Sequence, residues 1–176
     1  MCTPYALRSE KGEGTMSNDL NKTRIDHLFS TDIELDSWGF YPSVGGGVRV
    51  NATPKGGEVF NKSEVIGRVL PGGEVTQLLR YNGVFELDGR ITIKLNDGNL
   101  VYVPYTGRAD FCTVDEIKEF AAGNISRGVD IYFASPIEST DPKLDKMFTF
   151  AIGRLDDAKQ PRKLMLDIYE YECLPL

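Results

Sequence analysis

Asp88 and Arg90 are the residues of this sequence whose types and spacing best fit acid–base chemistry. One residue separates them in a segment with strand-like composition, residues 84–95, so their side chains point to the same face. An arginine in such a place can hold a developing enolate or phenolate oxygen by charge-assisted hydrogen bonds. Asp88, or Glu138 further along the chain, could act as the base if burial moved its pKa toward neutrality. The alternative is a purely structural Asp–Arg pair.

Tyrosines on neighbouring segments extend this candidate site. A tyrosine offers an apolar ring that can stack on an aromatic substrate and a hydroxyl that can donate a proton. We therefore predict Tyr105 as a catalytic residue beside Asp88, Arg90 and Glu138. For any one tyrosine, the alternative to a role in the site is packing in a core or interface. For the carboxylates of Glu138 and Asp145, the alternative is an exposed position at the surface. The predicted substrate-binding residues are Gln77, Tyr81, Tyr102, Tyr132 and Asp145.

No pattern in the sequence points to a metal ion or an organic cofactor. The chain has one histidine, His27, and three widely separated cysteines, whereas a structural zinc site needs about four such ligands. The glycine runs at residues 45–47 and 72–73 lack the G-x-x-x-x-G-K-[ST] spacing of a phosphate-binding loop. Barrel corners and bulges account for them better. We therefore predict chemistry without a metal or cofactor.

The composition excludes several classes of partner. Twenty Lys and Arg against 26 Asp and Glu give a net charge of −6 over 176 residues, and there is no basic block. Nucleic acid and anionic membranes are therefore not expected as partners. No apolar run approaches the roughly 18 residues of a membrane-spanning helix. Scattered thiols and an N-terminus without an apolar signal core predict a cytoplasmic protein, with a flexible tail over residues 1–22 and one domain over residues 23–176.

The elements that would position these residues are mostly β-strands. From about His27 onward, short β-branched and aromatic segments alternate with turn residues, which predicts an all-β barrel or sandwich. Asn82-Gly83 and Asp97-Gly98 suit two-residue type I′ turns and predict a three-strand meander over residues 74–105. One short helix is predicted over about residues 113–122, beginning at a T-x-x-E capping box.

Two-residue turns would also determine which side chains share a face, because register and facing are coupled. With such turns Gln77 pairs with Asp88, and Arg90 pairs with Tyr105. In one interpretation the polar face contacts solvent and the apolar face forms the core. In the other the polar face lines a ligand cavity inside a barrel, and the helix or a second subunit covers the apolar face. The polar face carries Gln77, Tyr81, Glu86, Asp88, Arg90, Thr92 and Tyr105, with Leu79 and Val103 among them. The apolar face carries Leu78, Phe85, Leu87, Ile91, Ile93, Leu100 and Tyr102.

The order of short motifs along the chain resembles that of a known family. Residues 56–107 contain two glycines, a G-x-V-L-P-G-G turn, a hydrophobic strand to Asn-Gly, L-D-x-R, Asp-Gly, and V-Y-V before a glycine. Further on come Y-F-A-S-P-I-E at residues 132–138, Leu-Asp at residues 144–145 and L-D-I-Y-E at residues 166–170. Together these motifs, spread over about residues 28–173, resemble the domain of unknown function 3237 family.

The resemblance implies a single antiparallel, calycin-like β-barrel. Some fungal members of the family look like biosynthetic isomerases or cyclases, including a chalcone-isomerase-type enzyme that closes a ring by intramolecular conjugate addition. A cofactor-free isomerase or cyclase is therefore implied, acting on a small hydrophobic or aromatic metabolite by proton transfer and oxyanion stabilisation. The alternative is a non-catalytic protein that binds a hydrophobic small ligand in the barrel.

A homodimer is also expected. Apolar residues occur on both faces of residues 101–105, and one helix can cover only one of the two surfaces. Edge strands need covering as well, and contact with a second subunit is one way to cover them.

Overall fold

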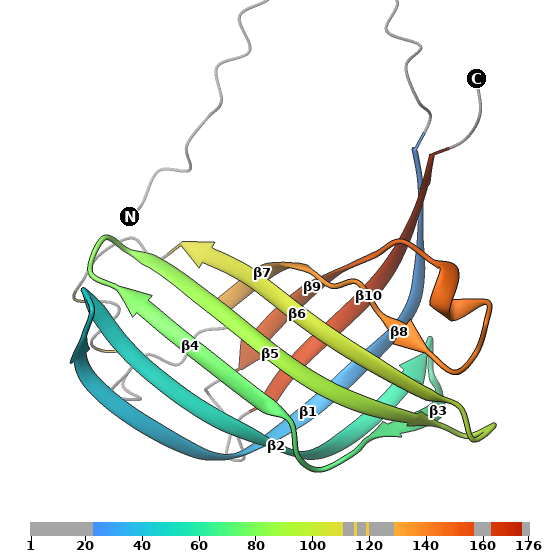
Figure 1. The fold of residues 1–176 in the computed structure, drawn as a ribbon, viewed down its shortest axis with the longest axis horizontal. Coiled ribbons are helices and arrows are strands. Elements are labelled where there is room, and N and C mark those ends of the chain that lie inside the picture. Colours follow the sequence, from blue (N-terminus) through green and yellow to red (C-terminus); the bar gives the residue numbers. More distant parts are fainter. Residues whose placement is uncertain (1–22, 111–114, 116–118, 120–128, 157–162, 174–176) are drawn as a thin grey trace, which may run out of the picture.

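The computed structural model describes residues 23–110, 115, 119, 129–156 and 163–173 of the chain. Nearly all of them lie in β-strands (Figure 1). Alternating β-branched, aromatic and polar residues favour this extended backbone. The strands are β1 (Thr23–Val44), β2 (Gly47–Asn61), β3 (Glu64–Val69), β4 (Glu74–Arg80), β5 (Val84–Leu95), β6 (Leu100–Asp110), β7 (Val129–Ala134), β8 (Glu138–Ser139), β9 (Thr149–Asp156) and β10 (Lys163–Cys173), with a short 3-10 helix, η1 (Leu144–Lys146), before β9.

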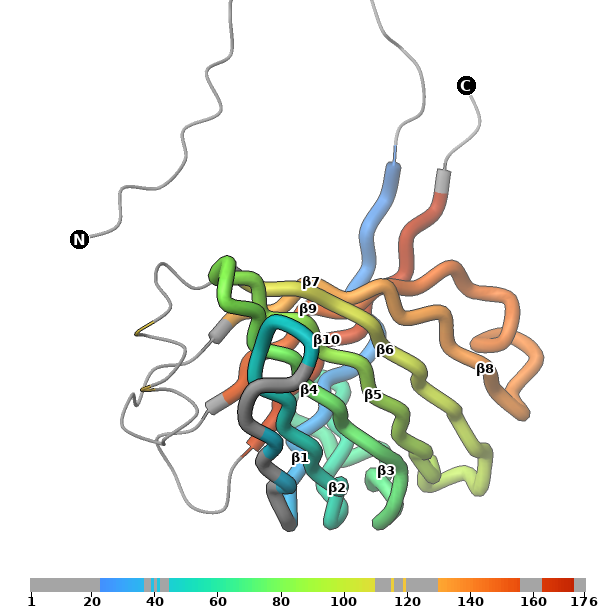
Figure 2. The backbone as a smooth tube through the Cα atoms, turned by 60° about the vertical axis from the view of Figure 1, so that its left-hand side comes forward, coloured from blue at the N-terminus to red at the C-terminus, as the bar shows by residue number. Residues whose placement is uncertain are grey.

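The strands form one antiparallel sheet that closes on itself (Figure 1, Figure 2). In the order β5-β4-β2-β1-β10-β9-β7-β6 each strand pairs with the next, and β6 pairs back with β5. Strands β3 and β4 both lie between β2 and β5. Each of them pairs with β2 on one side and with β5 on the other. The predicted all-β fold with a single antiparallel barrel is therefore confirmed.

Side-chain alternation separates an apolar interior from a polar exterior. On β5, for example, buried Phe85 and Leu87 alternate with Glu86 and Asp88 on the outer face. Each fully buried Leu, Ile or Phe side chain contributes roughly 1.5–3 kcal/mol to stability. The face that carries the acidic residues of β5 therefore lies outside the barrel and does not line its interior.

Two glycine positions let large rings lie flat across the inner surface of the sheet. A Cβ atom at Gly89 would come within 2.3 Å of the ring of Tyr105, its partner on β6. A Cβ atom at Gly107 would come within 2.3 Å of the ring of Phe133. The Tyr105 and Phe133 rings meet edge to face, with centroids 5.3 Å apart. These rings fill the space that the glycines leave.

The register of the central meander differs by one residue from the prediction. Gln77 pairs with Leu87 rather than Asp88, and Arg90 pairs with Pro104 rather than Tyr105. A shift of one residue moves a side chain to the other face of a strand. Tyr105 consequently points into the barrel, whereas Arg90 is exposed on the outside. The predicted shared face for these two residues was wrong.

The cause lies in the two hairpin turns. In each of them the glycine N–H donates to the carbonyl oxygen three residues earlier, at 3.0 Å. Gly83 and Gly98 have positive φ angles of 92° and 96°, whereas Asn82 and Asp97 do not have positive φ. This is the geometry of a three-residue loop, a type I turn followed by a glycine bulge, and not of a two-residue type I′ turn. The additional loop residue displaces every pair in both hairpins by one position.

Two predicted segments fall outside the described residues. The N-terminal tail over residues 1–22 is one of them. The helix over residues 113–122 is the other, apart from Asp115 and Glu119, which are both helical. Among the residues that the structure describes, no helix combines the length and the apolar character that a membrane crossing requires.

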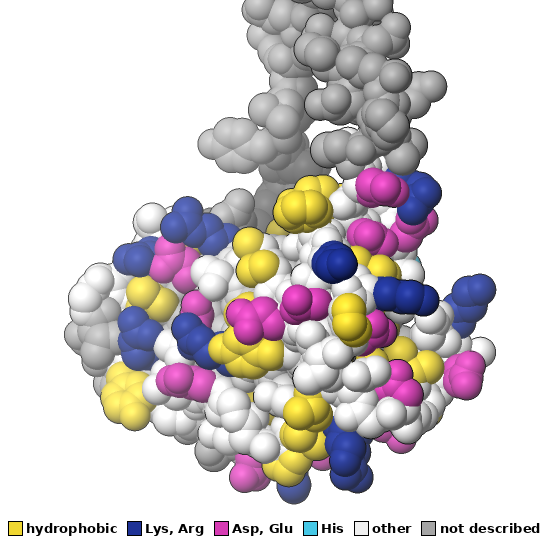
Figure 3. Space-filling model, turned by 45° about the vertical axis from the view of Figure 1, so that its right-hand side comes forward, with side chains coloured by type: hydrophobic (Ala, Val, Ile, Leu, Met, Phe, Trp, Pro, Cys, Tyr) yellow, Lys and Arg dark blue, Asp and Glu magenta, His cyan; other side chains and the backbone are white. Residues whose placement is uncertain are grey.

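Charged side chains of both signs share the barrel surface. On the face shown in Figure 3, Lys and Arg side chains are interspersed with Asp and Glu side chains and with separate hydrophobic groups. That face therefore produces no extended field of one sign.

Candidate functional site

A row of outward-facing side chains crosses five neighbouring strands of the barrel. Register places Arg49 on β2 opposite Leu78 on β4, and Leu78 opposite Glu86 on β5. Glu86 in turn lies opposite Arg108 on β6, and Arg108 lies opposite Tyr132 on β7. Cross-strand partners in an antiparallel sheet point to the same face and lie close enough to interact. The fold thus brings together residues that are far apart in the sequence.

This row lies in a groove of about 630 Å³ on the outer face. An apolar centre, Leu78, is flanked by guanidinium and carboxylate groups, and Tyr132 adds an aromatic ring at one end. A volume of this size is in the range of small-molecule sites. The groove is lined by Arg49, Thr76, Leu78, Arg80, Glu86, Leu87, Asp88, Thr106, Gly107, Arg108 and Tyr132.

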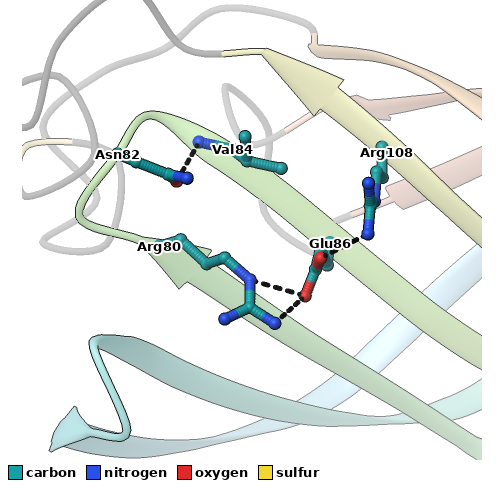
Figure 4. Close-up of polar contacts among 5 residues, drawn as sticks. All are labelled: Arg80, Asn82, Val84, Glu86 and Arg108. Carbon is teal, nitrogen blue, oxygen red and sulfur yellow. Dashed lines mark hydrogen bonds and ion pairs between the residues drawn. The ribbon is translucent and has the colours of Figure 1, made fainter.

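Within the groove, Glu86 is held between two arginines (Figure 4). Arg80 contacts Glu86 Oε2 through Nε at 2.9 Å and through Nη2 at 2.7 Å. Arg108 Nη2 lies 3.0 Å from Glu86 Oε1. The hydrogen bond from Arg80 is the main reason why the pKa of Glu86 is lowered, and burial opposes it. Glu86 is therefore ionised and already bonded, which makes it a poor proton acceptor.

Asp88 lies two residues after Glu86 on β5 and accepts hydrogen bonds from two neighbours. Thr106 Oγ1 donates to Asp88 Oδ2 at 2.8 Å, and Arg90 Nη1 donates to Asp88 Oδ1 at 2.8 Å. The Asp–Arg pair that the sequence suggested is thus present, on the outside of the barrel. Asp88 lines the groove, whereas Arg90 contacts Asp88 from the exposed side.

Arg49 differs from the other two arginines of the groove. Its side chain is half-buried, and within the described part of the chain no carboxylate forms an ion pair with it. Arg80 and Arg108 both bind Glu86, so Arg49 is the groove cation with the most hydrogen-bonding capacity left for a ligand.

Two predicted site residues, Gln77 and Tyr105, face the barrel interior instead of the groove. Both are buried, and neither the Tyr105 hydroxyl nor the Gln77 amide has a hydrogen-bond partner among the described residues. Burial is the main cause that raises the pKa of the Tyr105 hydroxyl, and the nearby charge of Asp88 adds to it. Tyr105 is therefore un-ionised, and the sheet separates it from Asp88 and Arg90.

The other predicted residues lie outside the groove. Tyr102 pairs with Glu138 near the opposite end of β6. Asp145, in η1, accepts a hydrogen bond from the Ser139 N–H at 3.0 Å. Tyr81 lies at the tip of the β4–β5 hairpin. Of the predicted set, the structure brings together in the groove only Asp88 and Tyr132.

A network of Ser30, His27 and Asp167 ties β1 to β10 elsewhere on the outer face. His27 Nε2 and Ser30 Oγ are 3.0 Å apart, and Ser30 Oγ donates to Asp167 Oδ1 at 2.5 Å. In a nucleophile triad the carboxylate would instead hold the histidine ring. Because the serine hydroxyl donates directly to the carboxylate, this arrangement does not activate a nucleophile.

The family described as Protein of unknown function (DUF3237) matches residues 23–170, which extend from the start of β1 into β10. The chain belongs to this family. The resemblance seen in the order of motifs is thereby confirmed. No curated protein matches the chain.

Solved structures share the DUF3237 barrel at low sequence identity. A conserved protein of unknown function from Rhodopseudomonas palustris is 21% identical with a TM-score of 0.67, over 86% of this chain and 99% of that one. A protein with unknown function from Clostridium acetobutylicum is 21% identical with a TM-score of 0.70, over 86% and 100%. An enzyme from Penicillium herquei is 16% identical with a TM-score of 0.55, over 85% and 95%. At these identities the likeness establishes the fold alone.

Four charged groove residues of this DUF3237 chain were absent from the predicted site: Arg49, Arg80, Glu86 and Arg108. The signal that could have found three of them is the outward alternation of β4, β5 and β6. Once the hairpins are aligned with three-residue loops, Leu78, Glu86 and Arg108 fall in one row, beside Arg80. Arg49 could not be found in this way, because its pairing with Leu78 links β2 to β4 across the intervening β3.

Proposed function

We propose that the outer groove binds a small, largely apolar metabolite with an acidic oxygen and promotes its cofactor-free isomerisation or ring closure. The observation that supports this most directly is Arg49, a half-buried groove arginine without an ion-pair partner among the described residues. Leu78 and Tyr132 provide apolar contact, and Arg49 provides charge-assisted hydrogen bonds to a phenolate, enolate or carboxylate oxygen.

For ring closure of an unsaturated phenol, the groove residues would have distinct roles. Asp88 accepts the phenol proton, and the phenolate oxygen then forms a C–O bond to the β-carbon of the enone. The electron pair moves onto the carbonyl oxygen, and Arg49 stabilises this enolate. The α-carbon takes the proton back from Asp88, so substrate and product are isomers. The apolar contact of Leu78 and Tyr132 keeps the two reacting groups close together.

Non-catalytic binding is the second candidate, and the state of the carboxylates favours it. The pKa of Glu86 is lowered by Arg80, and both oxygens of Asp88 accept hydrogen bonds. Neither group is therefore free to take a proton without giving up a protein contact. In this case the groove holds the same class of ligand through Arg49 and releases it unchanged.

The test uses 2′-hydroxychalcone, an unsaturated phenol that isomerises to a flavanone, with cinnamate as a carboxylate probe. We expect saturable binding of both probes to the native protein and loss of the chalcone absorbance in its presence. Arg49→Gln should weaken binding about 10- to 100-fold, the effect of losing one charge-assisted contact of roughly 1.5–3 kcal/mol. Arg68→Gln, an exposed arginine outside the groove, is the matched control.

The outcomes distinguish the two candidates. Binding with accelerated ring closure supports the isomerase, and binding without it supports the carrier. Equal affinity of the native and Arg49→Gln proteins, or no saturable binding to the native protein, would rule out the groove as the binding site.

A further inference from the structure

The first residues of β1 form an open sheet edge. Residues 23–28 lie against β10, but the pairing of β1 with β2 begins only at Ser30. Figure 1 shows this end of β1 and the end of β10 rising together beyond the rest of the barrel. Within the described part of the chain, residues 23–28 therefore have no strand neighbour on the side away from β10.

The backbone of Ile25 points toward this open edge. Ile25 lies opposite Tyr171 on β10, and the Tyr171 N–H donates to the Phe148 carbonyl oxygen at 2.9 Å, away from β1. In an antiparallel ladder the two residues of a pair direct their N–H and C=O groups either toward each other or both away. The N–H and C=O of Ile25 are therefore directed away from β10 and are available to another strand.

Exposed apolar side chains reach this edge in a row. Ile25, Tyr171 and Phe148 are cross-strand neighbours on one face, and they are 57%, 39% and 70% exposed. The rings of Phe148 and Tyr171 contact each other with centroids 6.0 Å apart. Such a row is unusual at the margin of a water-exposed sheet and suits contact with a protein surface.

We infer that a second copy of this chain adds its own β1 edge here, antiparallel and with a twofold axis at Ile25. The sequence around Ile25 is self-complementary for this pairing, because Arg24 of each copy then lies opposite Asp26 of the other. Opposite charges in directly paired positions are favourable. The two Ile25 residues exchange backbone hydrogen bonds, and the apolar rows of both copies join into one continuous stripe.

A cysteine at the proposed axis tests the pairing directly. In a background with Cys2, Cys112 and Cys173 changed to Ser, Ile25→Cys should form a disulfide-linked dimer under mild oxidation. Hydrogen-bonded antiparallel partners have Cα atoms roughly 5.5 Å apart, which matches disulfide geometry. Thr23→Cys is the matched control, because residue 23 of one copy is remote from residue 23 of the other. Equal cross-linking of both variants would overturn the proposed register.

Sedimentation of the unmodified chain tests the dimer itself. We expect a species of twice the 19.6 kDa chain mass at micromolar concentration. Asp26→Arg places like charges opposite Arg24 and should raise the dissociation constant about tenfold or more. The swap Arg24→Asp with Asp26→Arg restores opposite charges and should recover the dimer, whereas Glu64→Arg at a site remote from this edge should have no effect. A monomer at all concentrations, or a dimer insensitive to Asp26→Arg, would refute the proposal.

Discussion

Some buried polar side chains of this protein have no hydrogen-bond partner among the described residues. Tyr105 is only 1% exposed, its ring packs across Gly89, and its hydroxyl has no hydrogen-bond partner in the described part of the chain. A buried hydroxyl without a partner reduces stability, because it loses its contacts with water on folding. The ring therefore stabilises the barrel and the hydroxyl opposes that gain.

Separate substitutions at Tyr105 should distinguish these two contributions. Tyr105→Phe keeps the ring, so we expect an unchanged or increased free energy of unfolding, by up to about 1–3 kcal/mol. Tyr105→Ala also removes the ring and should cost about 3–5 kcal/mol. Urea denaturation monitored by circular dichroism measures both. Clear destabilisation by Tyr105→Phe would show that the hydroxyl has a partner in the folded protein.

At the scale of the strands, the hairpins explain both the success and the error of the sequence prediction. Asn-Gly and Asp-Gly correctly marked the two turns, but the same dipeptides occur in two- and three-residue loops. The predicted register left Leu79 and Val103 on the polar face, although both belong to the core. That mismatch was visible in the sequence. Aligning apolar positions across the hairpins, with Leu79 opposite Phe85, would have given the observed register.

The packing of Tyr105 over Gly89 links β6 to β5 and makes these two positions interdependent. Gly89→Ala would place a Cβ atom about where the ring lies, so we expect a loss of about 1–3 kcal/mol in unfolding free energy. In a Tyr105→Ala background the same change should cost much less. A double-mutant cycle by urea denaturation gives the coupling. Additive effects would mean that the ring moves aside without cost.

For the whole molecule, local patterns predicted an all-β chain but not the way in which the sheet closes. The pairings of β2 with β4 and of β7 with β9 join strands that are not consecutive, and no turn motif encodes them. The barrel itself was predicted from the family resemblance. The groove depends on the pairing of β2 with β4 for Arg49, which is why this part of it could not be predicted.

Stability should depend on pH through Glu86, which ties together β4, β5 and β6. Its folded-state pKa is lowered, chiefly by the hydrogen bond from Arg80, so its contribution is fully present above the ordinary carboxyl pKa of roughly 4.3. The contribution is lost as the pH falls through the lower folded-state value. The difference in unfolding free energy between the native protein and Glu86→Gln should therefore be largest at pH 7 and shrink in acid. Glu64→Gln is the control, and a difference that grows in acid would contradict this assignment.

The pairing of β1 with β10 has a consequence for how the protein is made. Thr23 lies opposite Cys173, so the sheet closes into a barrel only when the first and last strands meet. A ribosome must therefore have synthesised β10 before the barrel can close. Until then the apolar inner faces of β1 to β9 are not fully enclosed. The growing chain therefore exposes apolar strands to water, and such strands favour aggregation. Folding of this barrel is thus completed late, only after β10 has been translated.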